Sequence, residues 1–178
     1  DLLGLAPDSQ NRNIYYDPEF LTNYEMGINT KLLNSKLNIG AVIFYSDRED
    51  QQVSISTQVD PSDPNTFSYL TQNAAEGINK GLELSMDMEL TDSINVFANL
   101  GILKTEIKNW KSRPDLEGRA QAHAPERSFA LGFSWKPTEK TYLSLDVTGK
   151  SSFYYSDSHN NKSDSYALTN INYGYQKN

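Results

Sequence analysis

The sequence predicts an all-β fold: an antiparallel up-and-down meander of about seven strands from the wall of a larger transmembrane β-barrel. Three observations indicate this fold. Polar and apolar residues alternate in seven runs, short and long connections alternate between the runs, and aromatic residues gather near the ends of the runs. Alternation with a period of two is typical of a strand, because successive side chains point to opposite faces. The runs cover residues 24–32, 37–45, 78–90, 94–102, 128–135, 143–150 and 167–175.

The first two runs form a predicted hairpin around a tight turn at residues 33–36. In the first run, polar or small residues alternate with an apolar set that consists of Tyr24, Met26, Ile28, Thr30 and Leu32. In the second run the apolar set consists of Leu37, Ile39, Ala41, Ile43 and Tyr45. The opposite side of the second run carries Val42 and Phe44, so the alternation is weaker there.

The third run has the clearest alternation in the chain. One side carries Ile78, Lys80, Leu82, Leu84, Met86, Met88 and Leu90. The other side carries Asn79, Gly81, Glu83, Ser85, Asp87 and Glu89. Glu, Met and Leu favour helices, but a helix would place its apolar residues three and four positions apart. Here they are two apart, so a strand is predicted.

The remaining four runs follow the same rule. The fourth has an apolar side made of Ile94, Val96, Ala98, Leu100 and Ile102, and the fifth has Phe129, Leu131, Phe133 and Trp135. The sixth has Leu143, Leu145 and Val147, and the seventh has Ala167, Thr169, Ile171, Tyr173 and Tyr175. We expect strands of about nine to eleven residues, a length that crosses a membrane at a tilt.

The connections between the runs alternate strictly in length. The tight ones are residues 33–36, 91–93 and 137–140, and the long polar ones are residues 47 to about 67, 107–127 and 154–164. Short periplasmic turns and long extracellular loops are typical of an outer-membrane barrel. In that orientation the first and the seventh strand both run toward the periplasm.

Composition narrows the class of function. The 178 residues carry a formal net charge of -7, which argues against nucleic-acid binding, because that function usually needs a basic face. The absence of cysteine excludes a disulfide framework and a cysteine-based metal site. No Gly-x-Ser-x-Gly turn accompanies the serines that lie near His159, so we expect no catalytic triad and no enzyme.

A soluble antiparallel sheet that packs on a protein core would show the same alternation, and from the pattern alone it is the alternative. Such a chain would be a soluble or extracellular β-sheet module, for example an adhesin. The polar side of the strands favours the barrel, because a wet lumen accepts charges that a dry core would have to pair. These charges are Glu25, Glu83, Asp87, Asp146 and Lys150.

Five segments, in order along the chain, resemble the TonB-dependent outer-membrane receptors. The first, residues 17–27, contains Pro18-Glu19 and then Asn23-Tyr24-Glu25 before Gly27. The other four are residues 38–53 with Asp50 and Gln52, 73–84 with Asn73-Ala74 and Glu83, 119–126 with Arg119 and Ala124-Pro125, and 166–175 with Asn170 and Gly174-Tyr175. Each motif is short, but together they cover most of residues 17–175.

The resemblance implies a 22-stranded barrel with a plugged lumen in the outer membrane of a Gram-negative bacterium. It implies active uptake of a scarce ligand, most often a ferric siderophore, driven by the TonB complex. Residues 1–178 would be a partial barrel domain, without a plug domain, a TonB-box segment or the final strands. The implied partners are outer-membrane lipid, the plug domain and the TonB complex, and the isolated chain would be expected to self-associate.

In such a receptor the ligand contacts the loops and the upper wall of the lumen. The candidate ligand-binding residues are Asp47, Arg48, Glu49 and Asp50 after the second strand, and Tyr154, Tyr155, Asp157 and His159 after the sixth. Phenol and charged groups can hold a polar chelate by hydrogen bonds and stacking. For each residue the alternative is a solvated loop.

We expect no resident cofactor and no metal site. The acidic residues Asp60, Asp63 and Asp157 lack the glycine-centred spacing of a calcium loop. His123 and His159 lie in different loops without a third ligand. The charges on the polar side of the strands are expected to contact the plug and water.

Overall fold

The computed structural model describes residues 17–111, 113–157 and 159–177, and for residues 54–57, 68–72 and 74 it describes the backbone alone. The chain is all-β, as the alternation predicts. The strands are β1 (Phe20–Leu32), β2 (Leu37–Gln58), β3 (Phe67–Thr91), β4 (Ile94–Trp110), β5 (Arg127–Thr138), β6 (Thr141–Lys150) and β7 (Tyr166–Tyr175). A short 3₁₀ helix, η1 (Pro114–Leu116), follows β4.

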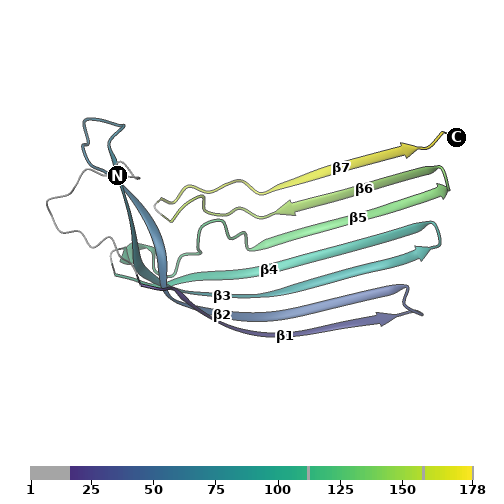
Figure 1. Ribbon diagram of the computed structural model, residues 1–178, viewed down its shortest axis with the longest axis horizontal. Coiled ribbons are helices and arrows are strands. Elements are labelled where there is room, and N and C mark those ends of the chain that lie inside the picture. Colours follow the sequence, from purple (N-terminus) through teal and green to yellow (C-terminus); the bar gives the residue numbers. More distant parts are fainter. Residues whose placement is uncertain (1–16, 112, 158, 178) are drawn as a thin grey trace.

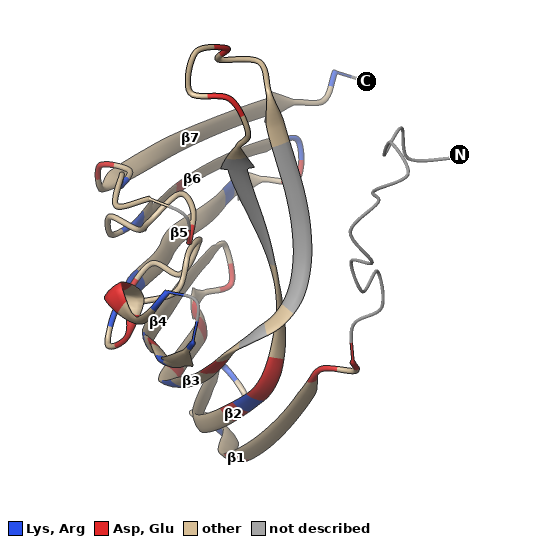
Figure 2. Ribbon diagram, turned by 90° about the vertical axis from the view of Figure 1, so that its left-hand side faces the viewer, with Lys and Arg blue, Asp and Glu red and all other residues tan. Residues whose placement is uncertain are grey.

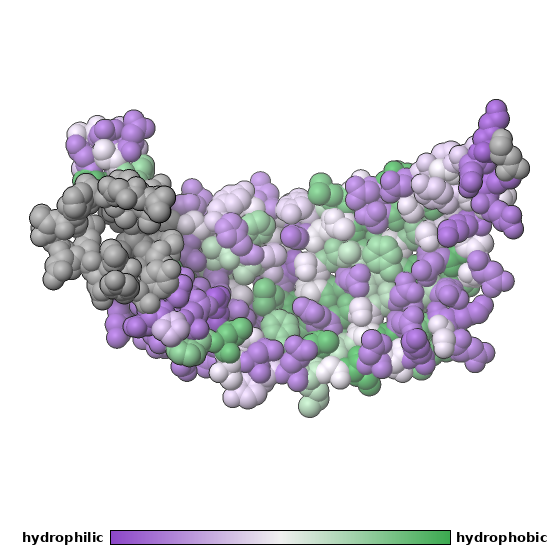
Figure 3. Space-filling model, in the orientation of Figure 1, coloured by the Kyte–Doolittle hydropathy of each residue, from purple (hydrophilic) through white to green (hydrophobic). Residues whose placement is uncertain are grey.

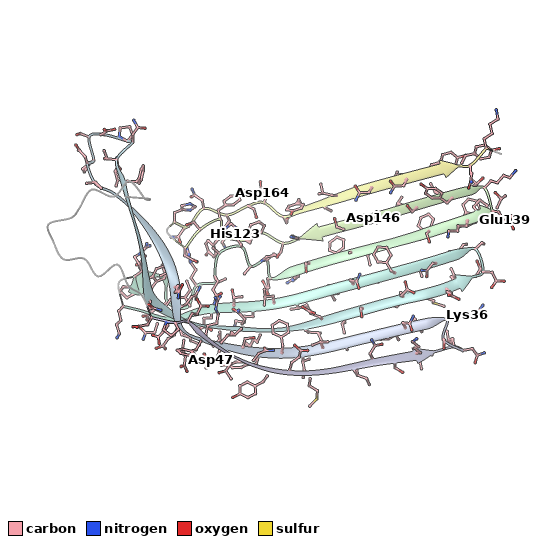
Figure 4. The ribbon with its side chains drawn as sticks, in the orientation of Figure 1. Lys36, Asp47, His123, Glu139, Asp146 and Asp164 are labelled. Atoms are coloured by element: carbon pink, nitrogen blue, oxygen red, sulfur yellow. The ribbon has the colours of Figure 1, made fainter. Side chains whose placement is uncertain are left out.

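The seven strands form one sheet in the order β1-β2-β3-β4-β5-β6-β7, and each pairs antiparallel with the next (Figure 1). Figure 4 shows Lys36 and Glu139 at the end of the sheet where the tight turns lie. Asp47, His123 and Asp164 lie at the opposite end, with the long connections. The meander and the alternating connections are therefore confirmed.

The strand register aligns the alternating residues of all seven strands into two faces. One row across the sheet reads Ile28, Ala41, Leu84, Leu100, Phe129, Gly149 and Ala167. The neighbouring row reads Asn29, Gly40, Ser85, Asn99, Ala130, Thr148 and Leu168. Within the residues that the structure describes, no core covers the apolar face, since Met26, Ile28 and Ile171 are 73%, 65% and 67% exposed.

The sheet is curved, and its polar face is the concave one. Figure 2 shows the strands as an arc when the sheet is viewed from the end with the long connections. A hollow of about 840 Å³ on the inner side is lined by Asn29, Glu83, Ser85, Asn99 and Lys150, among others. The apolar set therefore lies on the convex face. Figure 3 views the sheet from the concave side, where hydrophobic residues show among polar ones over the middle of the strands and hydrophilic residues gather at both ends.

Three strands, β2, β3 and β4, are much longer than the nine to eleven residues that we expected. We expected β2 to end before Asp47, but it continues to Gln58, and β3 already begins at Phe67. The connection between them is only residues 59–66. Likewise β4 continues to Trp110 rather than ending near Ile107. The extensions are held by backbone pairing, as from Ser54↔Thr71 to Gln58↔Phe67.

A small buried cluster lies where the β2–β3 extension leaves the sheet. It consists of Val53, Ala75, Ile107, Trp110 and Leu116, which β2, β3, β4 and η1 contribute. The cluster anchors the long connection after β4 to the end of the sheet. In the part of the chain that the structure describes, no helix is long and apolar enough to cross a membrane.

Glycines face aromatic rings at four directly paired positions of the sheet. The pairs are Phe44↔Gly81, Phe97↔Gly132, Phe129↔Gly149 and Tyr142↔Gly174. A Cβ atom at each of these glycines would lie 2.0–2.6 Å from the ring that faces it. Each ring therefore occupies the volume that a side chain would need, which helps to define the strand register.

Candidate functional site

The segment that enters β1 is held against β2 and β3 at the end of the sheet with the long connections. The backbone nitrogen of Asp17 donates to Oδ1 of Asn73 at 2.7 Å, and Nδ2 of Asn73 donates back to the Asp17 carbonyl at 2.8 Å. Nε2 of Gln52 donates to the same carbonyl at 3.1 Å. These three hydrogen bonds therefore fix the entry segment to β2 and β3.

Glu19 adds an ion pair to this attachment. Its carboxylate accepts hydrogen bonds from the guanidinium of Arg48, with Nε at 3.0 Å, and from the backbone nitrogen of Gln52 at 3.1 Å. Partial burial raises the pKa of Glu19, but the hydrogen bonds from Arg48 and Gln52 and the charge of Arg48 outweigh it, so the pKa is lowered. The ionised form of Glu19 is therefore stabilised in the folded chain.

We expect Glu19→Gln to loosen the entry segment, because the amide keeps an acceptor for Gln52 but loses the charge that Arg48 binds. Protection of the Gln52 amide from hydrogen exchange should fall by up to about fivefold, the range of a partly exposed ion pair. In the unchanged protein the same protection should be complete at neutral pH. It should be lost as the pH falls through the lowered pKa of Glu19. Equal protection at every pH in the two proteins would contradict this role.

A second cluster joins the connection after β4 to the connection between β6 and β7. Its centre is the guanidinium of Arg119, whose side chain is only 9% exposed. The guanidinium lies 4.4 Å above the ring of Tyr154. Its hydrogen bonds run to the Ser156 carbonyl at 3.1 Å, Asp157 Oδ1 at 3.2 Å, the His159 carbonyl at 2.9 Å and Asn160 Oδ1 at 3.0 Å.

Further contacts make these two connections one unit. Oδ1 of Asp157 also accepts from the backbone nitrogen of Ala122 at 3.0 Å, and the Tyr154 carbonyl accepts from the backbone nitrogen of His123 at 2.8 Å. The Tyr154 ring has a second cation, Nζ of Lys162, at 4.3 Å from its centroid. We name these contacts the Arg119 junction.

We expect Arg119→Met to release both connections while the sheet remains intact. The variant loses charge-assisted hydrogen bonds worth about 1.5–3 kcal/mol each. Amide exchange in residues 113–126 and 151–157 should therefore accelerate roughly tenfold or more. Lys162→Met is the matched control, because it removes a cation from the same ring without touching the hydrogen bonds. The junction would lose its assigned role if exchange in the two connections were unchanged in the Arg119 variant.

The eight predicted ligand-binding residues fall into two separate groups. The structure corrects the placement of Asp47, Arg48, Glu49 and Asp50, which lie within β2 rather than in a loop. Tyr154, Tyr155, Asp157 and His159 lie in the connection between β6 and β7, as expected. Among the described residues, no hydrogen bond or ion pair joins the first group to the second.

Several of the eight residues have contacts within the chain. Arg48 pairs with Glu19, and Tyr154 and Asp157 belong to the Arg119 junction. Asp50 lies at a strand irregularity with a φ of 53°, where its carbonyl accepts from Nδ2 of Asn73 at 2.7 Å. The exposed residues of the set are Glu49, Asp50, Tyr155 and His159, whereas Asp47 is half-buried.

Reasoning from the sequence did not identify the residues that organise this end of the sheet. Arg119, Gln52 and Asn73 each lie in a segment that resembles the TonB-dependent receptors. The motifs therefore marked their positions, but no pattern indicated that they hold other segments in place. Their partners are far away in the sequence: 38 residues for Arg119 and Asp157, and 56 for Asn73 and Asp17.

Two carboxylates on the concave face are bound by neighbouring amides. Asp146 (Figure 4) accepts from Nδ2 of Asn170 at 2.8 Å, and Asp87 accepts from Nδ2 of Asn95 at 3.2 Å. Within the described residues no three His, Cys, Asp or Glu side chains lie together so that they could hold a metal ion. The arrangement offers hydrogen bonds, charge and aromatic stacking, which suit the binding of a polar molecule.

A curved meander with an apolar convex face, a polar concave face and all long connections at one end defines a class: the wall of a transmembrane β-barrel. A family model described as "TonB dependent receptor-like, beta-barrel" matches residues 3–178. The chain belongs to this family of TonB-dependent receptors, and it forms a portion of the barrel.

Relatives in sequence and structure agree with this assignment. The chain is 33% identical over 101 residues to PiuA of Acinetobacter baumannii, a probable TonB-dependent siderophore receptor. The aligned residues make up 56% of this chain and 12% of PiuA. The crystal structure of PiuA from the same organism has a TM-score of 0.70 at 23% identity, and covers 89% of this chain and 22% of PiuA.

Two further solved structures show the same fold. The ferric-catecholate import receptor Fiu of E. coli K12 has a TM-score of 0.67 at 20% identity, over 92% of this chain and 22% of Fiu. The copper transporter OprC has a TM-score of 0.70 at 16% identity, over 90% of this chain and 23% of OprC. The chain spans about a fifth of the length of these solved proteins.

Proposed function

We propose that the protein to which this chain belongs is an outer-membrane receptor for TonB-dependent active uptake of a scarce ligand. The observation that supports this proposal most is a curved sheet with one apolar face and one polar face, in a chain that belongs to this family. The convex face is apolar over the middle of the strands, which suits lipid. The concave face is polar and hollowed, which suits a wet lumen or a plug domain.

A ferric siderophore is the proposed ligand. PiuA is named a probable siderophore receptor and Fiu a ferric-catecholate import receptor. OprC, a copper transporter, has the same fold, so loop residues rather than the wall must select the ligand. In this chain the exposed candidates Glu49, Asp50, Tyr155 and His159 are the proposed ligand contacts, since the other predicted residues are half-buried or bound within the chain.

The proposed partners follow from the two faces. Outer-membrane lipid covers the convex face, the plug domain contacts the concave face, and the TonB complex supplies energy. No catalytic step is assigned to these residues, because the family is one of receptors and transporters. In water the isolated chain should self-associate or require detergent, since its apolar face and both edge strands are exposed.

The test is an uptake measurement in the source bacterium with the full-length gene deleted and then restored. Uptake of a radiolabelled ferric siderophore should fall on deletion, return on restoration and disappear when TonB is deleted. The receptor should fractionate with outer membranes. Labelled copper is the control cargo. Recovery of the protein in the cytosol, which the alternative of a soluble β-sheet module allows, or uptake that is independent of TonB would overturn the proposal.

A further inference from the structure

Cationic side chains form a row on the convex face, at the end of the apolar band where the long connections lie. The register pairs Tyr24 with Tyr45, Tyr45 with Lys80, and Lys80 directly with Lys104. The next row toward the tight turns is apolar on four strands and then ends in Arg127, which pairs with Ile102. Lys104 and Arg127 are thus diagonal neighbours, at most about 7–8 Å apart across the two strands.

Cations outnumber carboxylates in this part of the convex face. Two carboxylates, Asp47 and Glu106, lie in the next row toward the long connections, and the charges of Lys104 and Lys80 act on Glu106. Like charges directly opposite each other on neighbouring strands are unfavourable, which applies to Lys80 and Lys104. The nearby carboxylate of Glu106 is bound to Nζ of Lys108 at 2.8 Å. Among the described residues, Lys80, Lys104 and Arg127 have no ion pair within 4.0 Å, and all three are exposed.

The distance of this row from the opposite end of the apolar band matches the spacing of the two membrane interfaces. Ten residues of β4 separate Lys104 from Ile94, whose row also contains Trp135 and Tyr173. At a rise of about 3.4 Å per residue and a tilt of about 45°, this length spans roughly 25 Å across the membrane. That value equals the height of the apolar band of an outer-membrane barrel. The two ends of the band therefore carry tyrosine with lysine and tryptophan with tyrosine, the residues typical of interfaces.

We propose that Lys80, Lys104 and Arg127 bind the phosphate groups of a phosphorylated lipid in the extracellular leaflet of the outer membrane. Phosphates between Lys80 and Lys104 relieve the repulsion of the two ammonium groups, and Arg127 can hold a phosphate in bidentate fashion. The acyl chains of the lipid then lie along the apolar rows below, which include Ile43, Leu82 and Ile102. This inference rests on the proposed function, since it takes the long connections to be extracellular.

The experiment uses the full-length receptor in neutral detergent and native mass spectrometry with diphosphorylated lipid A as the probe. The variant Lys80→Gln/Lys104→Gln should bind the probe roughly 25-fold more weakly, about fivefold for each cation at an anionic surface. Lys80→Arg/Lys104→Arg keeps the charges and should retain binding. The matched control, Lys136→Gln/Lys140→Gln, removes two cations at the tight-turn end and should leave binding unchanged.

Two further measurements make the outcomes decisive. Dephosphorylated lipid A should bind the unchanged receptor weakly, and millimolar inorganic phosphate should not displace the phosphorylated lipid; the opposite result for either probe overturns the inference. The glutamine variant should still fractionate with outer membranes. If it does so and binds the phosphorylated lipid as the unchanged receptor does, only this inference fails. Failure of the unchanged receptor to reach the outer membrane would instead overturn the proposed function.

Discussion

Replacing Leu100 by arginine should destabilise the full-length receptor in lipid vesicles by about 2–4 kcal/mol, the cost of a cation at the middle of the bilayer. Leu100 lies on the convex face, in the row that pairs Leu84 with Leu100 and Leu100 with Phe129. This row is close to the middle of the apolar band, too far from either interface for the guanidinium to reach water at low cost. The measurement is the free energy of unfolding from a urea titration.

The neighbouring residue is the matched control. Asn99 is adjacent in the sequence but lines the hollow of the concave face. Asn99→Arg therefore adds the same charge to the wet side of the wall, where the loss should stay below about 1 kcal/mol. If the two arginine variants lost equal stability, the convex face would not be the face that meets lipid, and the proposed orientation of the wall would be wrong.

Gly81→Ala should cost about 1–3 kcal/mol, as expected for overpacking a filled site. A Cβ atom at residue 81 would lie 2.5 Å from the carbonyl oxygen of Ile102 and 2.6 Å from Cζ of Phe44. The oxygen belongs to the backbone of the neighbouring strand, so it can move only if the pairing of β3 with β4 distorts. The same urea titration measures the loss.

Gly27→Ala is the control for this prediction. A Cβ atom at residue 27 would meet only the side chain of Val42 at 3.2 Å and the Ala41 carbonyl at 3.5 Å, contacts that need a small adjustment. Its loss should be clearly smaller than that of Gly81→Ala. Combining Gly81→Ala with Phe44→Leu should recover part of the loss, because the ring is one of the two obstacles. No recovery, together with equal losses for the two glycines, would show that the ring does not restrict this site.

The two faces of the wall could be predicted from the sequence alone. Alternation in residues 78–90 or 94–102 is a property of each strand by itself, since neighbouring side chains of a strand always point to opposite sides. The tight turns at residues 33–36 and 91–93 interrupt these patterns and could be located to within a residue or two. The resemblance to the TonB-dependent receptors, which the family match confirms, likewise rests on short local motifs.

The lengths of the strands and the internal contacts of the loops could not be predicted in this way. The extension of β2 past Asp47 depends on its pairing with β3, and such pairing joins two segments that are separate in the sequence. Arg119 lies in a polar segment whose sequence predicts only a solvated loop. Its structural role arises only when the chain brings it to Tyr154 and Asp157.

Lys80 illustrates both the pattern within one strand and the register between strands. From the sequence alone it is the single charge on the otherwise apolar side of residues 78–90. The sequence alone places this lysine on the same face as its apolar neighbours, because the period of a strand fixes the face of every residue. The positions of Lys104, directly opposite, and of Arg127, diagonally below, follow from the folded sheet. Register depends on the pairing of separate strands, and each strand carries only its own local pattern.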